Sequence, residues 1–361
     1  MGLKNWESPE REGVNRKPDS AKGILPRSYD LILESALRIF ARERLLLMSQ
    51  FGKGMDYRQF ICGDTRVPSM PMPVVVFSSP RKLPKAPDLG GRVIVLDVAF
   101  AGKGLGKSFD KSTGRLIFEL GERLAAWVDH HDNERHIDYK GDPRFVLSTK
   151  SHHHACAEMI TPELVERVGR VDTIVAHGDL DGLYSVAKWV LGGHPPYNGA
   201  DADARAVDSR IGTPGDLGKL IDRALRARPR DEKLFNSVVR YLVSGCKGGG
   251  EEEEIMEAAD EFSLLEAASL ELAEDYRVEG RVAFVDIGDP IQRFDKTELL
   301  LYGQKLAPVA IVKQGQNVTA AAPYDSGLDF VEMLGLGGGM PTRVTVKAVR
   351  LEELMNKVNE S

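Results

Sequence analysis

The sequence has few cysteines, no long apolar run and no excess of positive charge. Its three cysteines, Cys62, Cys156 and Cys246, are odd in number and widely spaced, which argues against a disulfide framework or a zinc knuckle. No apolar run approaches the roughly 20 residues that cross a bilayer, so we expect no membrane partner. The formal net charge of −6 argues against a protein that coats duplex nucleic acid. This composition suits a reducing compartment, and we predict a cytoplasmic protein.

The rest of the composition is that of a globular chain with room for two domains. Of its 361 residues, 42% are hydrophobic and 28% are charged. Residues 1–26 are polar and contain proline, so we predict a mobile tail. We then predict a catalytic domain over 27–245, a linker helix over 246–278 and a smaller domain over 279–361.

Short apolar runs alternate with helical patterns in the predicted catalytic domain. The runs cover residues 74–77, 92–96, 124–128 and 172–176. Continuous apolar runs are typical of strands that are covered on both faces. Strands alternating with helices predict an α/β fold with a doubly wound, mostly parallel sheet, followed by a smaller α+β domain. The segment 192–215 carries several aspartates and is predicted to be a long loop.

Carboxylates and imidazoles follow three of these runs. They are Asp97, then Asp129, His130 and His131, and then His177, Asp179 and Asp181. Because the carboxyl ends of parallel strands share one edge of a sheet, these side chains should meet in one crevice. So many ionisable groups would repel one another or shift their pKa values unless cations were bound. Mixed oxygen and nitrogen ligands favour manganese or a similar first-row ion, and their number suits two ions.

Each of these segments also has a purely structural interpretation. Asp179 could cap the helix that follows it, because aspartate is a favoured N-cap residue. Asp97 alone could simply end its strand. The run His152–His154 could hold a metal, but a polar loop before a helix is the simpler explanation. The metal interpretation is favoured because all three segments follow apolar strands.

Taken together, the motifs resemble those of the DHH phosphoesterase superfamily. The likeness is carried by His-x-Asp-x-Asp-Gly over 177–182, by the strand-terminal Asp97 and by Asp129-His130-His131. The segment 155–160 is similar to the helix that follows Asp-His-His in that family. The last domain resembles the DHH-associated C-terminal domain, whose glycine-rich phosphate-gripping loop would be Gly337, Gly338 and Gly339.

The superfamily includes RecJ-like exonucleases, nanoRNases, cyclic-dinucleotide phosphodiesterases and family II pyrophosphatases. The resemblance implies a hydrolase that cleaves phosphodiester bonds of short oligonucleotides or dinucleotides, cyclic ones included, with a hydroxide activated by two metal ions. It implies Mn²⁺, with Mg²⁺ or Co²⁺ as alternatives, and short single-stranded nucleic acid or a dinucleotide as partner. Hydrolysis of pyrophosphate or polyphosphate, nucleotide binding without catalysis, and a homodimer are also left open.

The resemblance assigns a role to each motif residue. One ion would be held by His177, Asp179 and Asp97, and the other by Asp181, Asp97 and His130. Asp97 would thus bridge the ions. Asp129 would orient the histidines, as carboxylates behind metal-bound histidines do, and His131 would face the substrate phosphate. Asp129, His130 and His131 are therefore the predicted catalytic residues.

The chain departs from the family pattern in the order of its motifs. The family has His-x-Asp-x-Asp first, the lone aspartate second and Asp-His-His last. Here Asp97 comes first, Asp129-His130-His131 second and the segment 177–181 last. This order predicts a circularly permuted catalytic domain, in which spatial contacts are kept while the chain ends move.

Two further departures concern the ligands of metal and phosphate. The family's fourth metal-binding aspartate has no obvious counterpart, and Asp208 is the first candidate, with Asp64 second. The glycine loop continues into Met340 instead of histidine, and the family's basic substrate-gripping residue is absent. Arg343 or Lys347 would therefore have to bind the substrate phosphate.

Overall fold

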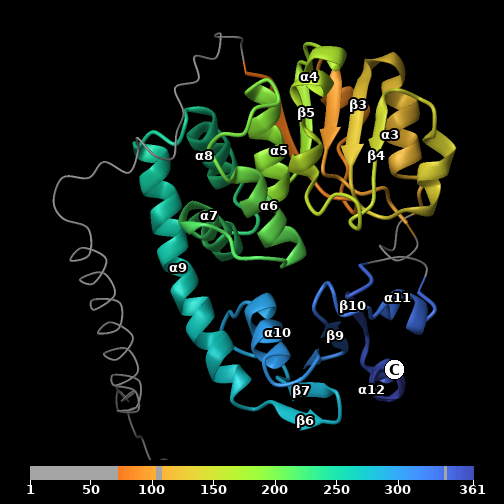
Figure 1. Ribbon diagram of the computed structural model, residues 1–361, viewed down its shortest axis with the longest axis vertical. Helices are drawn as coiled ribbons and strands as arrows, with labels where there is room; N and C mark the ends of the chain where they lie inside the picture. Colours follow the sequence, from red (N-terminus) through yellow and green to blue (C-terminus); the bar gives the residue numbers. More distant parts are fainter. Residues whose placement is uncertain (1–71, 103–107, 337–339) are drawn as a thin grey trace, which may run out of the picture. The chain divides into compact units, whose positions relative to one another are not determined.

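The structure is a computed structural model that describes residues 72–102, 108–336 and 340–361. The predictions for the tail 1–26, for Asp64 and for Gly337, Gly338 and Gly339 lie outside these residues. The described residues all belong to one compact unit, Arg58–Ser361. They form two β-sheets with separate hydrophobic cores (Figure 1).

The first sheet has five strands, all parallel, in the order β1-β5-β2-β3-β4. They are β1 (Val74–Ser78), β2 (Val93–Leu96), β3 (Leu124–Asp129), β4 (Phe145–Leu147) and β5 (Thr173–His177). The four predicted strands and the α/β class are confirmed. The edge strand β4 is not among the predicted strands, because its three residues are too few to show a period.

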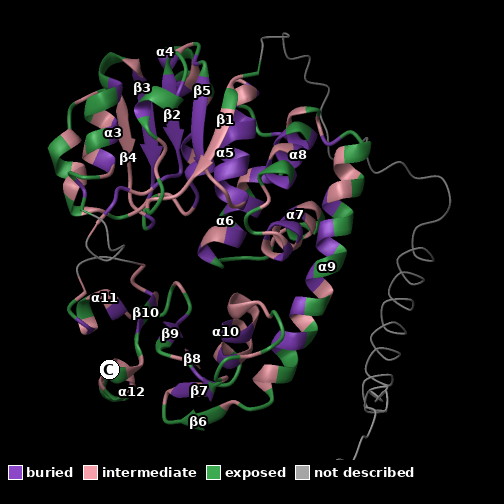
Figure 2. Ribbon diagram, turned by 180° about the vertical axis from the view of Figure 1, so that it is seen from behind, coloured by how far each residue is buried: buried purple, intermediate pink, exposed green. Residues whose placement is uncertain are grey.

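The parallel sheet is covered on both faces, as predicted for a doubly wound fold. Strand β2 is fully buried, and alternate residues belong to different cores. Ile94 and Leu96 pack in the core that includes α5 (Leu180–Val190), whereas Val93 and Val95 pack with α3 (Thr113–Leu120). Burial on both faces explains why the strands read as continuous apolar runs (Figure 2). The short helix α4 (Pro162–Val168) leads into β5.

Four helices follow β5 and α5 along the chain. They are α6 (Ala200–Ser209), α7 (Asp216–Ala227), α8 (Glu232–Val243) and α9 (Gly250–Ala273). The predicted loop over 192–215 is wrong, because it contains α6. This helix buries mainly alanine, and the buried Asp203 accepts hydrogen bonds from the Tyr197 hydroxyl and the Gly215 backbone N–H, both at 2.6 Å. Tertiary contacts therefore stabilise a helix whose polar sequence shows little apolar periodicity.

The second sheet is mixed, in the order β10-β9-β8-β7-β6, and only β7 and β8 are parallel. Its strands are β6 (Arg277–Glu279), β7 (Val282–Asp286), β8 (Val309–Gln314), β9 (Asn317–Ala321) and β10 (Arg343–Lys347). The helices around it are α10 (Lys296–Gln304), α11 (Phe330–Met333) and α12 (Leu351–Glu360). The predicted α+β architecture is confirmed, while the predicted domain boundaries stay predictions.

Candidate metal centre

The three predicted motifs lie on neighbouring strands of the parallel sheet. Strand β5 pairs with β2, and β2 pairs with β3. The carboxyl ends of these strands carry the motifs that begin at His177, Asp97 and Asp129 respectively. The motifs thus meet at one sheet edge although their order along the chain differs from the family's.

Asp97 is held at this edge by an unusual backbone conformation. Its φ of 56° is in the left-handed region, which costs free energy for residues other than glycine. Its backbone N–H donates to the Val128 carbonyl at 2.9 Å, and only 2% of the residue is exposed. Burial raises the pKa of Asp97 well above its ordinary value, and the carboxylates of Asp181 and Asp179 raise it further.

His130 presents one ring nitrogen to three carboxylates. Its Nδ1 lies 2.8 Å from the His153 carbonyl, which can only accept, so Nδ1 carries the proton. Its Nε2 lies 3.4 Å from Asp97 Oδ1, 3.5 Å from Asp181 Oδ2 and 3.7 Å from Asp208 Oδ2. These distances are too long for good hydrogen bonds.

A cation accounts for this arrangement. Among the described residues, neither His130 Nε2 nor Asp97 Oδ1 has a hydrogen-bond partner, and both residues are buried. A buried nitrogen lone pair that faces carboxylate oxygens is costly unless a positive ion lies between them. The donor set therefore fits a divalent metal.

Asp181 is fixed by the turn that follows the histidine run. Its two oxygens accept hydrogen bonds from the backbone N–H groups of Cys156, at 2.6 Å, and Ala157, at 2.9 Å. These residues belong to a 3-10 helix, η5 (Cys156–Met159), within the segment predicted to be helical. Burial raises the pKa of Asp181 to about 7. His130 opposes this rise, whereas Asp208 adds to it.

Asp179 caps α5, as its sequence context suggested, and it also lies against His177. Its Oδ1 accepts from the Gly182 backbone N–H at 3.1 Å and so caps α5. Its Oδ2 lies 2.7 Å from His177 Nδ1. The Asp179 carboxylate raises the pKa of His177 to about 10, whereas His177 overcomes the effect of burial and keeps the pKa of Asp179 low.

Helix α6 carries Asp208 next to His130, and Asp208 is the first of the two aspartates predicted as candidates for a fourth metal ligand. Its Oδ2 also accepts a hydrogen bond from Lys150 Nζ at 2.6 Å. The Lys150 side chain is only 7% exposed, and burial opposes its charge, but Asp208 keeps the pKa of Lys150 above its ordinary value. The sequence analysis missed Lys150, because it follows a loop and matches no motif.

Three sets of side chains have ligand atoms within 4.8 Å of one another. They are Asp97, His130 and His131; Asp97, His177 and Asp179; and His130, Asp181 and Asp208. Asp97 and His130 each belong to two sets, so the sets adjoin. This clustering brings together six of the predicted metal ligands and His131.

Asp129 lies behind the cluster and belongs to none of the three sets. It is fully buried, and its Oδ1 lies 2.7 Å from His131 Nδ1. Burial opposes its charge, but His131 and His130 keep the pKa of Asp129 below its ordinary value. Asp129 therefore orients the partly exposed ring of His131, which lies at the edge of the cluster.

The histidine run 152–154 belongs to none of the three sets, but its backbone contacts His130. His153 Nδ1 lies 2.8 Å from Ser148 Oγ, while its carbonyl accepts from His130. The His154 ring packs edge-on against Tyr324, with ring centroids 5.6 Å apart. The polar-loop interpretation of this run agrees with these contacts.

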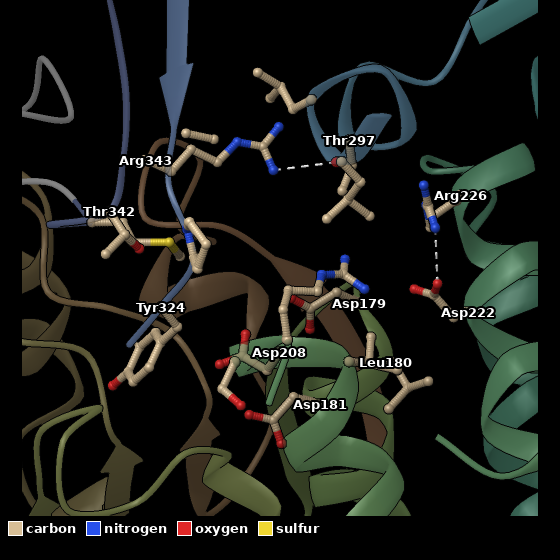
Figure 3. A pocket seen from close by; sticks show the side chains of 18 of the residues that line it. Asp179, Leu180, Asp181, Asp208, Asp222, Arg226, Thr297, Tyr324, Thr342 and Arg343 are labelled. Carbon is tan, nitrogen blue, oxygen red and sulfur yellow. Dashed lines mark hydrogen bonds and ion pairs between the residues drawn. The ribbon is translucent and has the colours of Figure 1, made fainter. Parts of the chain in front are cut away.

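A pocket of about 320 Å³ opens beside the acidic cluster. Asp179, Asp181 and Asp208 line one side of it, and Arg343 lines the other (Figure 3). The predicted substrate-binding Arg343 therefore reaches the pocket. Its alternative, Lys347, does not line the pocket, and its Nζ donates instead to Asn317 Oδ1 at 3.3 Å.

The close approach of α5 to β5 requires glycine at position 182. A Cβ atom there would lie 2.3 Å from the His177 carbonyl oxygen, which is backbone and cannot rotate away. We expect Gly182→Ala to lower the free energy of unfolding by about 1–3 kcal/mol and to weaken metal binding, because it displaces Asp179 and Asp181. Chemical denaturation and calorimetric Mn²⁺ titration would measure both effects.

Gly250→Ala provides the matched control for this prediction. Gly250 begins α9, and a Cβ atom there would have no neighbour within 4 Å among the described residues. This variant should keep its metal affinity and should be as stable as the parent protein or slightly more stable. Equal metal affinity in both variants would contradict the packing role of Gly182.

No protein-family model matches the chain, and no curated protein matches it. Among solved structures, the pGpG-specific phosphodiesterase PggH from Vibrio cholerae is similar at 13% identity and a TM-score of 0.39, over 65% of this chain and 78% of that chain. Exonuclease RecJ bound to manganese is similar at 14% identity and a TM-score of 0.39, over 76% and 77%. At this TM-score neither likeness supports a conclusion about this chain.

Proposed function

We propose that this protein is a divalent-metal-dependent phosphoesterase that hydrolyses phosphodiester bonds of short oligonucleotides or dinucleotides. The observation that carries the proposal is the pair of buried, unpartnered atoms, His130 Nε2 and Asp97 Oδ1, at the centre of a carboxylate cluster. Mixed nitrogen and oxygen donors without thiolates favour Mn²⁺, with Mg²⁺ or Co²⁺ as alternatives. A pocket beside the cluster leaves room for a substrate.

The ligand sets suggest where two ions would be held. His177, Asp179 and Asp97 would hold one ion, and His130, Asp181 and Asp208 the other, with Asp97 Oδ1 3.4 Å from His130 Nε2 of the second set. Bound divalent ions would supply activation of water and stabilisation of the negative charge that develops on phosphorus. This is the chemistry that hydrolysis of a phosphodiester requires.

The protein's own residues orient the reacting groups. Asp129 holds the His131 ring through Nδ1, which leaves Nε2 of this partly exposed side chain as the ring atom available to a substrate oxygen. Backbone N–H groups of η5 fix both oxygens of Asp181, so the carboxylate cannot rotate. We therefore assign His131 to the substrate phosphate and Asp129 to the support of His131.

The proposal is tested by a substrate screen with the purified full-length chain. We expect hydrolysis of dinucleotides, cyclic dinucleotides or short single strands with Mn²⁺ and no hydrolysis in EDTA. Asp179→Asn should lower turnover at least about a hundredfold, because asparagine still caps α5 but no longer offers an anionic ligand. Turnover of pyrophosphate alone would instead indicate a phosphoanhydride hydrolase.

Asp231→Asn is the matched control, because Asp231 caps α8 through the same kind of side-chain contact. It should change turnover less than about twofold, since asparagine and aspartate are equivalent caps. Full activity of Asp179→Asn with an unchanged metal content would contradict the assignment of Asp179 as a metal ligand. Nucleotide binding without turnover under any divalent ion would indicate a non-catalytic binding protein.

None of the described helices is long and apolar enough to cross a membrane. The predicted cytoplasmic location and the homodimer stay predictions. Gel filtration coupled to light scattering would measure the oligomeric state.

A further inference from the structure

The carboxylate that orients His131 is held at only one of its two oxygens. Asp129 Oδ1 lies 2.7 Å from His131 Nδ1. Asp129 Oδ2 is also buried, but among the described residues it accepts no hydrogen bond. A buried carboxylate oxygen without a donor costs free energy, and a carboxylate held at one oxygen can still turn about its Cβ–Cγ bond. The partner of Oδ2 therefore decides how firmly the His131 ring is held.

His136 presents a ring nitrogen to this free oxygen. Its Nε2 lies 4.0 Å from Asp129 Oδ2, and it too is buried without a hydrogen-bond partner within the described part of the chain. This distance is about 1 Å longer than a hydrogen bond, so a small turn of the ring or a bridging water closes the link. The two atoms are complementary in chemistry, and each is the polar group that the other lacks.

The state of His136 fits a donor. Burial lowers the pKa of His136 below its ordinary value, against the opposing effects of Asp129 and Asp132. A neutral imidazole carries one proton, on one of its two nitrogens. Because a carboxylate oxygen can only accept, the nitrogen that faces it carries the proton. His136 Nε2–H is therefore the donor and Asp129 Oδ2 the acceptor.

The local structure holds the His136 ring in this place. His136 belongs to a 3-10 helix, η4 (Glu134–Tyr139), which Asn133 caps by accepting a hydrogen bond from the Arg135 backbone N–H at 3.0 Å. The Asn133 side chain also donates to the Phe100 carbonyl at 3.1 Å. The His136 ring packs edge-on against the Phe100 ring, with centroids 5.0 Å apart. These contacts fasten η4 to the segment that follows β2 and keep the His136 side chain only 15% exposed.

We propose that His136 is a positioning residue that holds the second oxygen of Asp129 and thereby fixes the direction of the His131 ring. This inference rests on the proposed function, in which His131 Nε2 meets the substrate phosphate. The His131 side chain is 29% exposed, so its direction depends on the Asp129 carboxylate. A carboxylate anchored at both oxygens leaves the ring one orientation, and that orientation is the one used in the reaction.

The first test measures steady-state kinetics of the full-length chain with Mn²⁺ and a dinucleotide. His136→Leu removes the donor and keeps an apolar side chain against Phe100. We expect kcat to fall about tenfold to a hundredfold, which is the usual effect of losing a partner behind an active-site histidine. KM and the calorimetric affinity for Mn²⁺ should change less than about twofold, because the metal ligands and the pocket are untouched.

Tyr139→Leu is the matched control for packing. Tyr139 lies in the same helix and packs edge-on against the same Phe100 ring, with centroids 5.5 Å apart. This variant loses an aromatic contact but no donor to Asp129. Its kcat should stay within about twofold of that of the parent, even where the free energy of unfolding falls.

His136→Gln tests the donor directly. A glutamine side chain keeps an amide N–H group at nearly the position of the imidazole Nε2–H and carries no charge. Its kcat should be at least about fivefold higher than that of His136→Leu. An unchanged kcat in His136→Leu, an equal fall in Tyr139→Leu, or a glutamine variant no better than the leucine variant would each overturn the inference.

Proton NMR of the metal-free protein separates this inference from the proposed function. With ¹⁵N-labelled histidine, the His131 Nδ1 proton should give a downfield resonance, because a buried carboxylate accepts it. We expect this resonance to broaden or move upfield in His136→Leu and to persist in Tyr139→Leu and His136→Gln. That pattern supports the role of His136 even if no substrate is hydrolysed. Hydrolysis by the parent with an unaltered resonance in His136→Leu would leave the proposed function standing and remove the role of His136.

Discussion

Asp97→Asn should abolish hydrolysis and at the same time stabilise the metal-free protein. Asp97 belongs to two of the three ligand sets, and metal ions supply several kcal/mol of transition-state stabilisation, so we expect turnover to fall about a thousandfold or more. In EDTA the substitution removes a buried charge that Asp181 and Asp179 repel. The free energy of unfolding should therefore rise by about 1–2 kcal/mol.

Steady-state turnover with Mn²⁺ and urea denaturation in EDTA measure these opposite effects. Asp110→Asn is a suitable control, because its side chain is 78% exposed and its partner Arg135 is 3.8 Å away. It should change neither quantity measurably. If Asp97→Asn lost stability in EDTA, Asp97 would be a paired structural carboxylate and the geometric argument for a cation would be wrong.

Lys150→Met should have the opposite effect on the metal-free protein. Removing the ammonium leaves Asp208 without its partner at 2.6 Å, in a place where both side chains are mostly buried. Breaking a buried ion pair in this way costs about 3–5 kcal/mol. Mn²⁺ should restore more stability to this variant than to the parent, because the ion then provides the positive charge that Asp208 has lost.

Thermal unfolding with and without Mn²⁺ measures this difference. Lys233→Met is the matched control, because Lys233 Nζ lies 2.7 Å from Glu254 but its side chain is 80% exposed. Water screens such a pair, and its loss should cost less than about 1 kcal/mol with no dependence on metal. An equal response of both variants to Mn²⁺ would show that Lys150 is remote from the metal centre.

The elements that could be predicted from the sequence are those with a clear local pattern of apolar residues. A strand that is buried on both faces must be apolar throughout, and so β2, β3 and β5 could be read directly. Polar residues at the ends of such strands gather at one sheet edge whatever the order of the motifs along the chain. That topological rule predicted that Asp97, His130 and Asp181 would meet.

The elements that the sequence analysis missed depend on contacts between distant segments. Helix α6 has a polar sequence, and the buried hydrogen bonds of Asp203 hold it. Lys150 matches no motif, because its role comes from Asp208, which lies opposite it in space. Asp208 could be named only as a candidate until α6 was seen to carry it next to His130.

The sequence by itself determined the parallel sheet and the side chains at its edge, because the repeat of apolar runs and the chemistry of the strand ends are local properties. Only the tertiary structure decided which nitrogen of His130 is free and that Asp208 lies beside it. The physical reason is that burial and pairing are properties of neighbours in space. Those neighbours come from distant segments, such as His154 and Tyr324, whose ring centroids are 5.6 Å apart although the residues are 170 positions apart along the chain.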